Sequence, residues 1–264
     1  MKKLKIAFIL ILLIIVHVGF SQNSKFIIDS IYSQHLLETR TVCLYLPPNF
    51  DTKEVIPVIF TTDGQLIANG NYKQILDSLI INNIICPVVL IGVYSNDNKI
   101  LEDNIISYRQ YEYIKGFAKD NKEAEKRFEN HFTFFTQEVE EFVTAKYFIN
   151  PDTSKNTFYG TSNGGGFGIS LFFLCRNQYQ NYLCFSPLGY ETKRIIRNAG
   201  NNKERLFIAY GNNETPLLES YEKLLKILNK SGYTYNIHVF NGGHEQRFWK
   251  EYFKAIIIEL YKIE

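Results

Sequence analysis

The sequence of 264 residues lacks a dominant charge, an internal repeat and a low-complexity tract. Its 29 basic residues are balanced by 27 acidic ones, and three of the basic residues (Lys2, Lys3 and Lys5) precede an apolar run. The remaining chain is nearly neutral, with 26 basic and 27 acidic residues. Nucleic-acid binders usually carry a clustered basic face, and disordered chains are poor in apolar residues, whereas 45% of this chain is hydrophobic. Neither class fits, and no nucleic-acid partner is expected.

Cysteine is scarce, and its spacing excludes two kinds of site. The four residues, Cys43, Cys86, Cys175 and Cys184, fit neither a zinc-binding pattern nor a CxxC redox pair. We expect free buried thiols, although a single disulfide stays open if the protein is exported. No metal or cofactor is predicted.

Long apolar runs are absent except at the amino terminus. A basic start at 1–5 is followed by apolar residues at 6–20, and Gly19 and Ser21 are small enough for a cleavage site. We predict a signal peptide, residues 1–21, cut after Ser21. An uncleaved membrane anchor is the alternative, but about 15 apolar residues are fewer than the roughly 20 that a spanning helix needs. The expected product is a periplasmic or secreted domain, residues 22–264, without stable membrane insertion.

Strand-like and helix-like segments alternate along the rest of the chain. Strands are predicted at 25–31, 41–46, 56–62, 87–93, 156–160, 182–185, 205–210 and 235–240, and helices at 72–81, 132–147, 164–175, 216–229 and 246–263. Residues 94–130 show no regular pattern and are predicted to be a long functional loop. The alternation indicates one α/β domain with a mostly parallel sheet covered by helices on both faces, preceded by an antiparallel pair of strands.

One pentapeptide carries a recognisable chemistry. Gly160-Thr161-Ser162-Asn163-Gly164 fits G-x-S-x-G between a predicted strand and a predicted helix. A serine at such a sharp turn projects its hydroxyl above the sheet edge, and small neighbours let the turn close. The alternative is a glycine-rich helix start that packs closely on the sheet. The pattern predicts Ser162 as a nucleophile.

A serine nucleophile needs a base, and the chain has only five histidines: His17, His35, His131, His238 and His244. His17 belongs to the predicted signal peptide, and His238 lies inside an apolar strand, where a core or edge role is expected. His244 follows the last strand in a glycine-rich turn before the final helix. That is where an α/β-hydrolase places its base, so His244 is the predicted base.

The orienting acid follows by elimination, because no aspartate lies between Ser162 and His244. A triad acid projects from the carboxyl end of a strand, and Glu214 comes four residues after the predicted strand 205–210. Glu219 is the second candidate. An ordinary solvated loop carboxylate remains the alternative for Glu214.

An acyl-transfer site also needs hydrogen-bond donors for the developing oxyanion. The backbone amide of Asn163, directly after the nucleophile, is the first predicted donor. The second is expected in the loop after the third strand, Asp63-Gly64-Gln65, where the Gln65 amide is the candidate. An ordinary Asp-Gly turn is the alternative.

Taken together, these motifs resemble the esterase family that includes enterochelin esterases, feruloyl and acetylxylan esterases, and S-formylglutathione hydrolase. The resemblance rests on PVIFTTDGQ, VVLIGV, the GTSNGG turn, Arg109-x-x-Glu112-Tyr113, and Gly243-His244 with Trp249 five residues later. It implies an α/β-hydrolase fold and carboxylic ester hydrolysis, with Ser162 as nucleophile and His244 as base. A substrate role for Arg109 stays open.

The sequence therefore predicts an exported serine esterase that acts on a small-molecule ester, with siderophore, carbohydrate or aromatic esters as candidate substrates. Two alternatives stay open. The protein could transfer the acyl group to an alcohol instead of water, or it could be an inactive binding protein of the same fold.

Overall fold

The computed structural model describes residues 23–100, 106–117, 121–175, 178–190 and 203–263. The predicted signal peptide, 1–21, lies outside the described residues. Within the described ranges, every helix is too short or too polar to cross a membrane.

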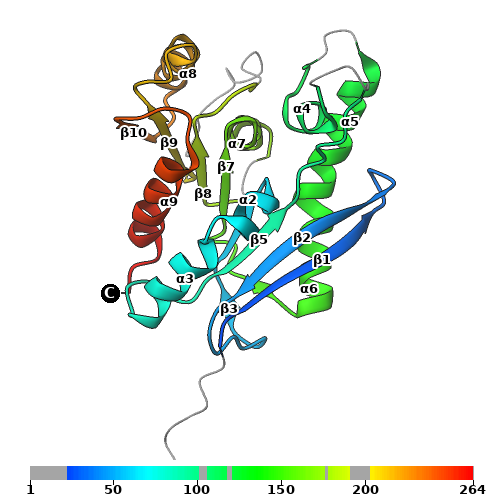
Figure 1. The fold of residues 1–264 in the computed structure, drawn as a ribbon, viewed down its shortest axis with the longest axis vertical. Helices are drawn as coiled ribbons and strands as arrows, with labels where there is room; N and C mark the ends of the chain where they lie inside the picture. The colour runs from blue at the N-terminus through cyan, green and yellow to red at the C-terminus, as the bar shows by residue number, and fades with distance from the viewer. Residues whose placement is uncertain (1–22, 101–105, 118–120, 176–177, 191–202, 264) are drawn as a thin grey trace, which may run out of the picture.

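Eight of the described strands form one sheet in the order β1-β2-β5-β4-β7-β8-β9-β10 (Figure 1). Strand β2 is antiparallel to both of its neighbours, and all the other pairs are parallel. This confirms the predicted, mostly parallel sheet with an antiparallel beginning. The strands are β1 (Lys25–Ser33), β2 (Glu38–Leu46), β4 (Val58–Thr61), β5 (Val89–Val93), β7 (Thr157–Thr161), β8 (Asn181–Phe185), β9 (Arg205–Gly211) and β10 (Tyr235–Phe240).

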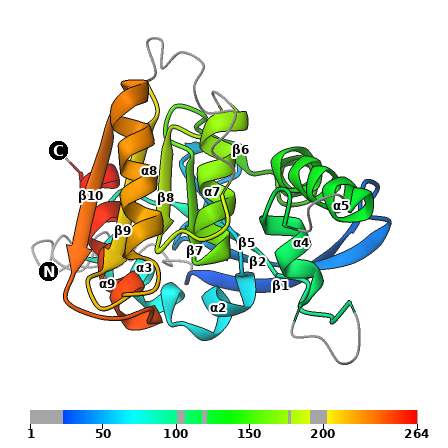
Figure 2. The same ribbon diagram turned by 90° about the horizontal axis from the view of Figure 1, so that it is seen from above.

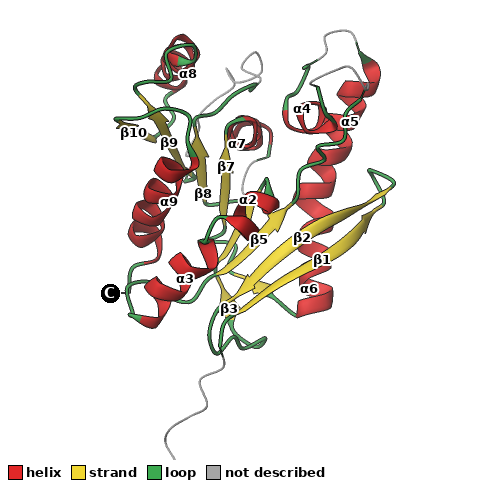
Figure 3. Ribbon diagram, viewed as in Figure 1, coloured by secondary structure: helices red, strands yellow, loops and turns green. Residues whose placement is uncertain are grey.

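Helices cover both faces of the sheet, as predicted (Figures 2 and 3). Helices α3 (Tyr72–Ile81) and α9 (Gln246–Tyr261) pack on one face, and their apolar side chains share a core with Leu90 of β5. Neighbouring Ile91 belongs to the core of the opposite face, because successive side chains of a strand point to opposite sides. That face is covered by α5 (Lys122–Thr133), α6 (Val139–Tyr147), α7 (Asn163–Leu174) and α8 (Leu218–Ser231).

The predicted loop at 94–130 is wrong, because it contains α4 (Tyr108–Tyr113) and α5. Only Ala124, Phe128 and His131 of α5 are buried, at the i, i+4, i+7 spacing of one helix face. The other positions are polar except Phe132, so the apolar signal is sparse. The predicted helix at 132–147 is the continuation of α5 through a π-helical turn, η1 (Phe134–Glu138), into α6.

The predicted strand at 56–62 is also divided. Val55–Ile56 forms a short strand β3 that pairs with β6 (Asn150–Pro151), and β4 begins only at Val58. Pro57 separates them, since proline lacks an N–H to donate to a ladder. The four cysteines are free thiols, and Cys43 and Cys184 are buried.

A charged contact joins the edge strand β1 to α6 and predicts a pH-dependent stability. The Asp29 carboxylate lies 2.6 Å from Lys146 Nζ and accepts a hydrogen bond of 2.5 Å from Tyr147 Oη. These bonds, the lysine's first, lower the pKa of Asp29 to about 2. The ionised carboxylate therefore stabilises the fold above about pH 4, and this contribution is lost as the pH falls toward 2.

Replacing Asp29 with asparagine is accordingly expected to lower the free energy of unfolding at pH 7 by about 0.5–1 kcal/mol, the range of a partly solvated pair. The difference from wild type should shrink by pH 3, because the wild-type protein then loses part of the same contribution. Urea unfolding of both proteins at pH 7 and pH 3 measures this. A difference that does not change with pH would contradict it.

Candidate active site

Ser162 occupies a strained turn between β7 and α7, in the strand–turn–helix setting expected from its pattern. Its φ of 56° and ψ of −125° are costly for a residue with a side chain. The end of β8 and the segment after it hold this conformation, because Ser162 N donates to the Phe185 carbonyl at 2.9 Å and Leu188 N donates to the Ser162 carbonyl at 3.0 Å. A Cβ on Gly160 would lie 2.4 Å from the Gly164 carbonyl oxygen, so this turn requires glycine.

The structure brings Ser162, His244 and Glu214 into one hydrogen-bonded chain. Ser162 Oγ lies 2.9 Å from His244 Nε2, and His244 Nδ1 lies 2.9 Å from Glu214 Oε2. Ser162 starts α7 after β7, Glu214 follows β9, and His244 lies between β10 and α9. These three parallel strands deliver their side chains to the same edge of the sheet. Glu219 is not part of this chain, because its side chain is 79% exposed and pairs with Lys223 on α8.

The carboxylate of Glu214 is buried and accepts several hydrogen bonds besides that of His244. Oε1 accepts from Ser186 Oγ at 2.7 Å and from Gly211 N at 2.8 Å, and Oε2 accepts from Tyr221 Oη at 2.6 Å. Burial opposes ionisation, but these bonds, with the His244 contact first among them, hold the pKa of Glu214 below its ordinary value. The ionised carboxylate favours the tautomer with a proton on Nδ1, which leaves Nε2 free to accept a proton from Ser162.

Trp249, in the first turn of α9, contacts both Ser186 and His244. Its Nε1 donates to Ser186 Oγ at 2.9 Å, and its ring meets the His244 imidazole edge-on, with centroids 4.8 Å apart. From sequence, Trp249 enters only as part of a resemblance, and the roles of Ser186 and Tyr221 are missed. Ser186 directly follows the apolar run of β8, which was a usable signal, whereas Tyr221 lies on α8 with no local signal of its role.

The two predicted oxyanion donors lie at the starts of two helices, where the two segments contact each other. Asn163 begins α7, and Gln65 lies in the first turn of a short helix, α2 (Gly64–Asn69). Backbone N–H groups in a first helical turn have no partner within the helix. The approach of the two segments is close: a Cβ on Gly164 would lie only 2.2 Å from Thr62 Oγ1 and 2.9 Å from Asp63 Oδ2. The side chain of Gln65 is occupied elsewhere, since its Oε1 accepts from Ser95 N at 3.1 Å.

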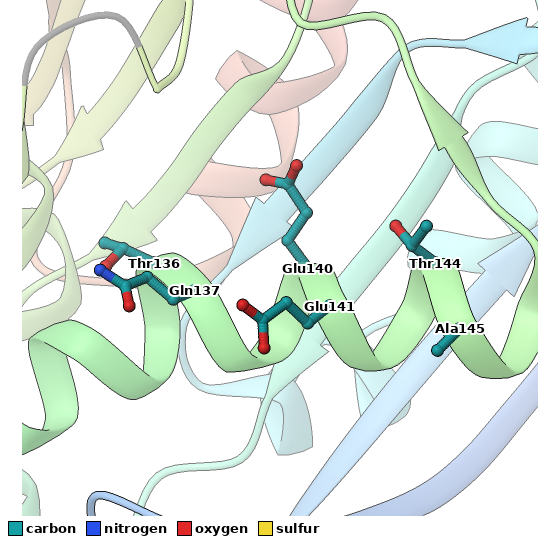
Figure 4. A pocket seen from close by; sticks show the side chains of 6 residues that line it. All are labelled: Thr136, Gln137, Glu140, Glu141, Thr144 and Ala145. Carbon is teal, nitrogen blue, oxygen red and sulfur yellow. The ribbon is translucent and has the colours of Figure 1, made fainter.

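A separate surface hollow lies over η1 and α6 (Figure 4). It offers two carboxylates, Glu140 and Glu141, and burial followed by the charge of Glu141 raises the pKa of Glu140. The described residues that line it include no serine, cysteine or histidine, which are components of an acyl-transfer site. Among the described residues there is no cluster of three or more histidine, cysteine and carboxylate side chains that could hold a metal ion.

The chain is similar to several known proteins. A family model described as "Putative esterase" matches residues 33–260. A ferulic acid esterase structure superposes with a TM-score of 0.74 at 18% identity, covering 91% of this chain and 98% of that one. An S-formylglutathione hydrolase from Agrobacterium tumefaciens gives 0.70 at 12% identity, covering 92% and 98%. The enterobactin esterase from Shigella flexneri gives 0.66 at 18% identity, covering 91% of this chain but only 60% of that one.

The comparison with curated proteins finds no match. The structural similarities, at these identities, confirm the α/β-hydrolase fold, and the family model confirms the resemblance drawn from the motifs. The match over residues 33–260 shows that the chain belongs to this esterase family, and the protein is a serine carboxylic ester hydrolase.

Proposed function

We propose that this protein is an exported serine esterase in which Ser162 is the nucleophile, His244 the general base and acid, and Glu214 the orienting carboxylate. The observation that carries the proposal is the continuous chain of two 2.9 Å contacts from Ser162 Oγ through the imidazole to Glu214. The serine end of this chain is partly exposed, and the His244 side chain is 33% exposed. A substrate can therefore approach the hydroxyl while the carboxylate stays shielded.

The reaction proceeds in two balanced halves. His244 Nε2 takes the proton of Ser162 Oγ as that oxygen bonds to the acyl carbon, and the carbonyl electrons move onto oxygen. The backbone amides of Asn163 and Gln65 donate to this oxyanion. When the tetrahedral intermediate collapses, the ester C–O bond breaks and the alcohol leaves with the proton from His244. Water then repeats the sequence on the acyl-enzyme, which releases the acid and restores Ser162.

An ester with an aromatic part is the substrate class that we favour. The similar structures include a ferulic acid esterase and an enterobactin esterase that was crystallised in the presence of an N-benzoyl-serine compound. Four of the nine aromatic rings in the 94–135 segment are buried and pack in the core: Tyr113, Phe128, Phe134 and Phe135. Tyr111 and Phe117 are among the rings that are at least partly exposed, with ring centroids 5.9 Å apart, and this pair is the one that we propose flanks a substrate ring.

A panel of esters tests the function and the substrate class together. The purified protein would be assayed on a catechoyl-serine ester, a feruloyl sugar, an acetyl sugar and simple alkyl esters. We expect aromatic acyl esters to be hydrolysed with a kcat/KM at least about tenfold above the acetyl ester, the discrimination that one apolar contact supplies. Product analysis with and without an added acceptor sugar distinguishes acyl transfer from hydrolysis. No turnover of any ester by the folded protein would contradict the proposal.

Export is proposed from the basic start, the apolar run at 6–20 and the small residues Gly19 and Ser21. Expression of the full chain in a bacterial host, followed by mass measurement of the protein outside the cytoplasm, tests it. The expected product begins at Gln22. Protein that keeps residues 1–21, or that stays in the cytoplasm, would contradict cleavage and export.

A further inference from the structure

The triad leaves one sequence motif without a role: Arg109-x-x-Glu112-Tyr113, which forms part of helix α4. The guanidinium of Arg109 does not point freely toward a substrate. Its Nε donates to Asp63 Oδ1 at 2.7 Å and its Nη2 donates to Asp63 Oδ2 at 2.9 Å. Its Nη1 donates to Asn163 Oδ1 at 2.8 Å. One side chain therefore links the loop of one proposed oxyanion donor to the residue that supplies the other.

Asp63 is held in an unusual state by the same helix. Its backbone is left-handed, with φ 54° and ψ 47°, and its N–H donates to Tyr113 Oη at 3.3 Å. The residue is only 3% exposed, so its carboxylate needs a charged partner. Arg109 supplies that partner. Burial opposes the charge of Arg109, but the hydrogen bonds and charge of Asp63 raise its pKa, so the guanidinium stays protonated.

Helix α4 is held in place by buried ion pairs, so the position of Arg109 is well defined. The fully buried Glu112 accepts hydrogen bonds from Arg40 Nη1 at 2.8 Å and from Arg127 Nε at 2.9 Å. The Arg109 guanidinium also lies over the Tyr113 ring, 5.0 Å from its centroid, at the i, i+4 spacing of neighbours on one helix face. A short helix would otherwise be a weak support for a geometry that catalysis requires.

We propose that Arg109 is a positioning residue of the oxyanion hole, which sets the spacing of the Asp63–Gln65 loop and Asn163 and neutralises the Asp63 carboxylate beside the developing negative charge. This inference rests on the proposed function. A lysine cannot replace the planar fork, because an ammonium cannot contact two carboxylate oxygens and a side-chain amide in this flat arrangement. Loss of Arg109 would leave a buried negative charge next to the oxyanion and would free the two loops to move apart.

Steady-state kinetics on R109A and R109K test this role. We expect R109A to lower kcat by about 100-fold while KM changes by less than about threefold, because misplaced oxyanion donors weaken mainly the transition state. R109K should lower kcat by about tenfold, since it restores the charge without the fork. Guanidinium chloride at about 50 mM, well below denaturing concentrations, should raise the kcat of R109A at least about fivefold by filling the vacated space.

The matched control is R205A, which makes the same substitution at an arginine in an exposed ion pair, Arg205–Glu259. It should leave kcat within about twofold of wild type, with no response to guanidinium. If R109A fails to fold, D63N replaces it, because asparagine keeps the size of Asp63 and tolerates the left-handed backbone. D63N should lower kcat by about tenfold through loss of the two-point grip.

The outcomes separate the inference from the function on which it rests. An R109A protein that folds and keeps kcat within about threefold of wild type, while S162A is inactive, would overturn the positioning role and leave the esterase proposal standing. A rise in KM with kcat unchanged would also overturn the positioning role, because Arg109 would then bind substrate. An S162A protein that still hydrolyses esters would overturn both.

Discussion

Replacing Ser162 with alanine is expected to lower kcat/KM for ester hydrolysis by about 10⁴-fold or more, the effect seen when a triad nucleophile is removed. In the proposed mechanism this hydroxyl bonds to the acyl carbon, and no other described hydroxyl lies in hydrogen-bond contact with the His244 imidazole. The residual rate should reflect only substrate binding and the oxyanion donors. Initial rates on a chromogenic ester measure the effect directly.

Ser170 provides the matched control for this substitution. It lies on the same helix, α7, and its buried hydroxyl donates only to the Gly166 carbonyl at 3.1 Å. S170A should keep kcat/KM within about threefold of wild type, because it removes one local hydrogen bond and no reacting group. Equal melting temperatures of the two variants would show that the S162A effect is not a folding defect. Substantial hydrolysis by folded S162A would refute the nucleophile.

Replacing Glu214 with glutamine should have the second largest effect, a loss of about 10³- to 10⁴-fold in kcat. The neutral amide cannot hold the imidazole in the tautomer with a proton on Nδ1, and it cannot stabilise the imidazolium that forms when Ser162 loses its proton. KM should change little, since the carboxylate is buried and shielded from a bound ester.

The second acid candidate supplies the control for Glu214. E219Q changes a carboxylate five residues after Glu214 in the sequence. The Glu219 side chain is 79% exposed and forms an ion pair with Lys223 on the same helix. Its kcat should stay within about twofold of wild type. Parallel pH–rate profiles of the two variants would show which carboxylate supports the base. A large loss in E219Q together with full activity in E214Q would reverse the assignment.

The local parts of this site could be predicted from sequence, and the long-range parts could not. The turn around Ser162 is specified by adjacent residues, because a Cβ on Gly160 would lie 2.4 Å from the Gly164 carbonyl oxygen and a Cβ on Gly164 would lie 2.2 Å from Thr62 Oγ1. Glu214 could be predicted for a different reason: no aspartate follows Ser162, so few acidic residues remained as candidates. The contacts of Arg109 with Asp63 and Asn163 span 46 and 54 residues, and no pattern within either segment announces them.

The same distinction explains the error at residues 94–130. Helix α4 is six residues long, too short for a periodic pattern, and its position is fixed by buried pairs with Arg40 and Arg127. Helix α5 buries only three side chains, and a cap supports its start, because Asn121 Oδ1 accepts from Glu123 N at 3.0 Å. A helix determined by capping and distant ion pairs resembles a polar loop when only its apolar residues are counted.

Mass-spectrometric mapping after reaction with a fluorophosphonate tests the central claim most directly, since only a serine activated by a base reacts quickly. The wild-type protein should carry the label on the peptide that contains Ser162, and H244A should react at least about 100-fold more slowly at the same position. Labelling of a different serine, or an unchanged rate in H244A, would show that the imidazole does not activate this hydroxyl.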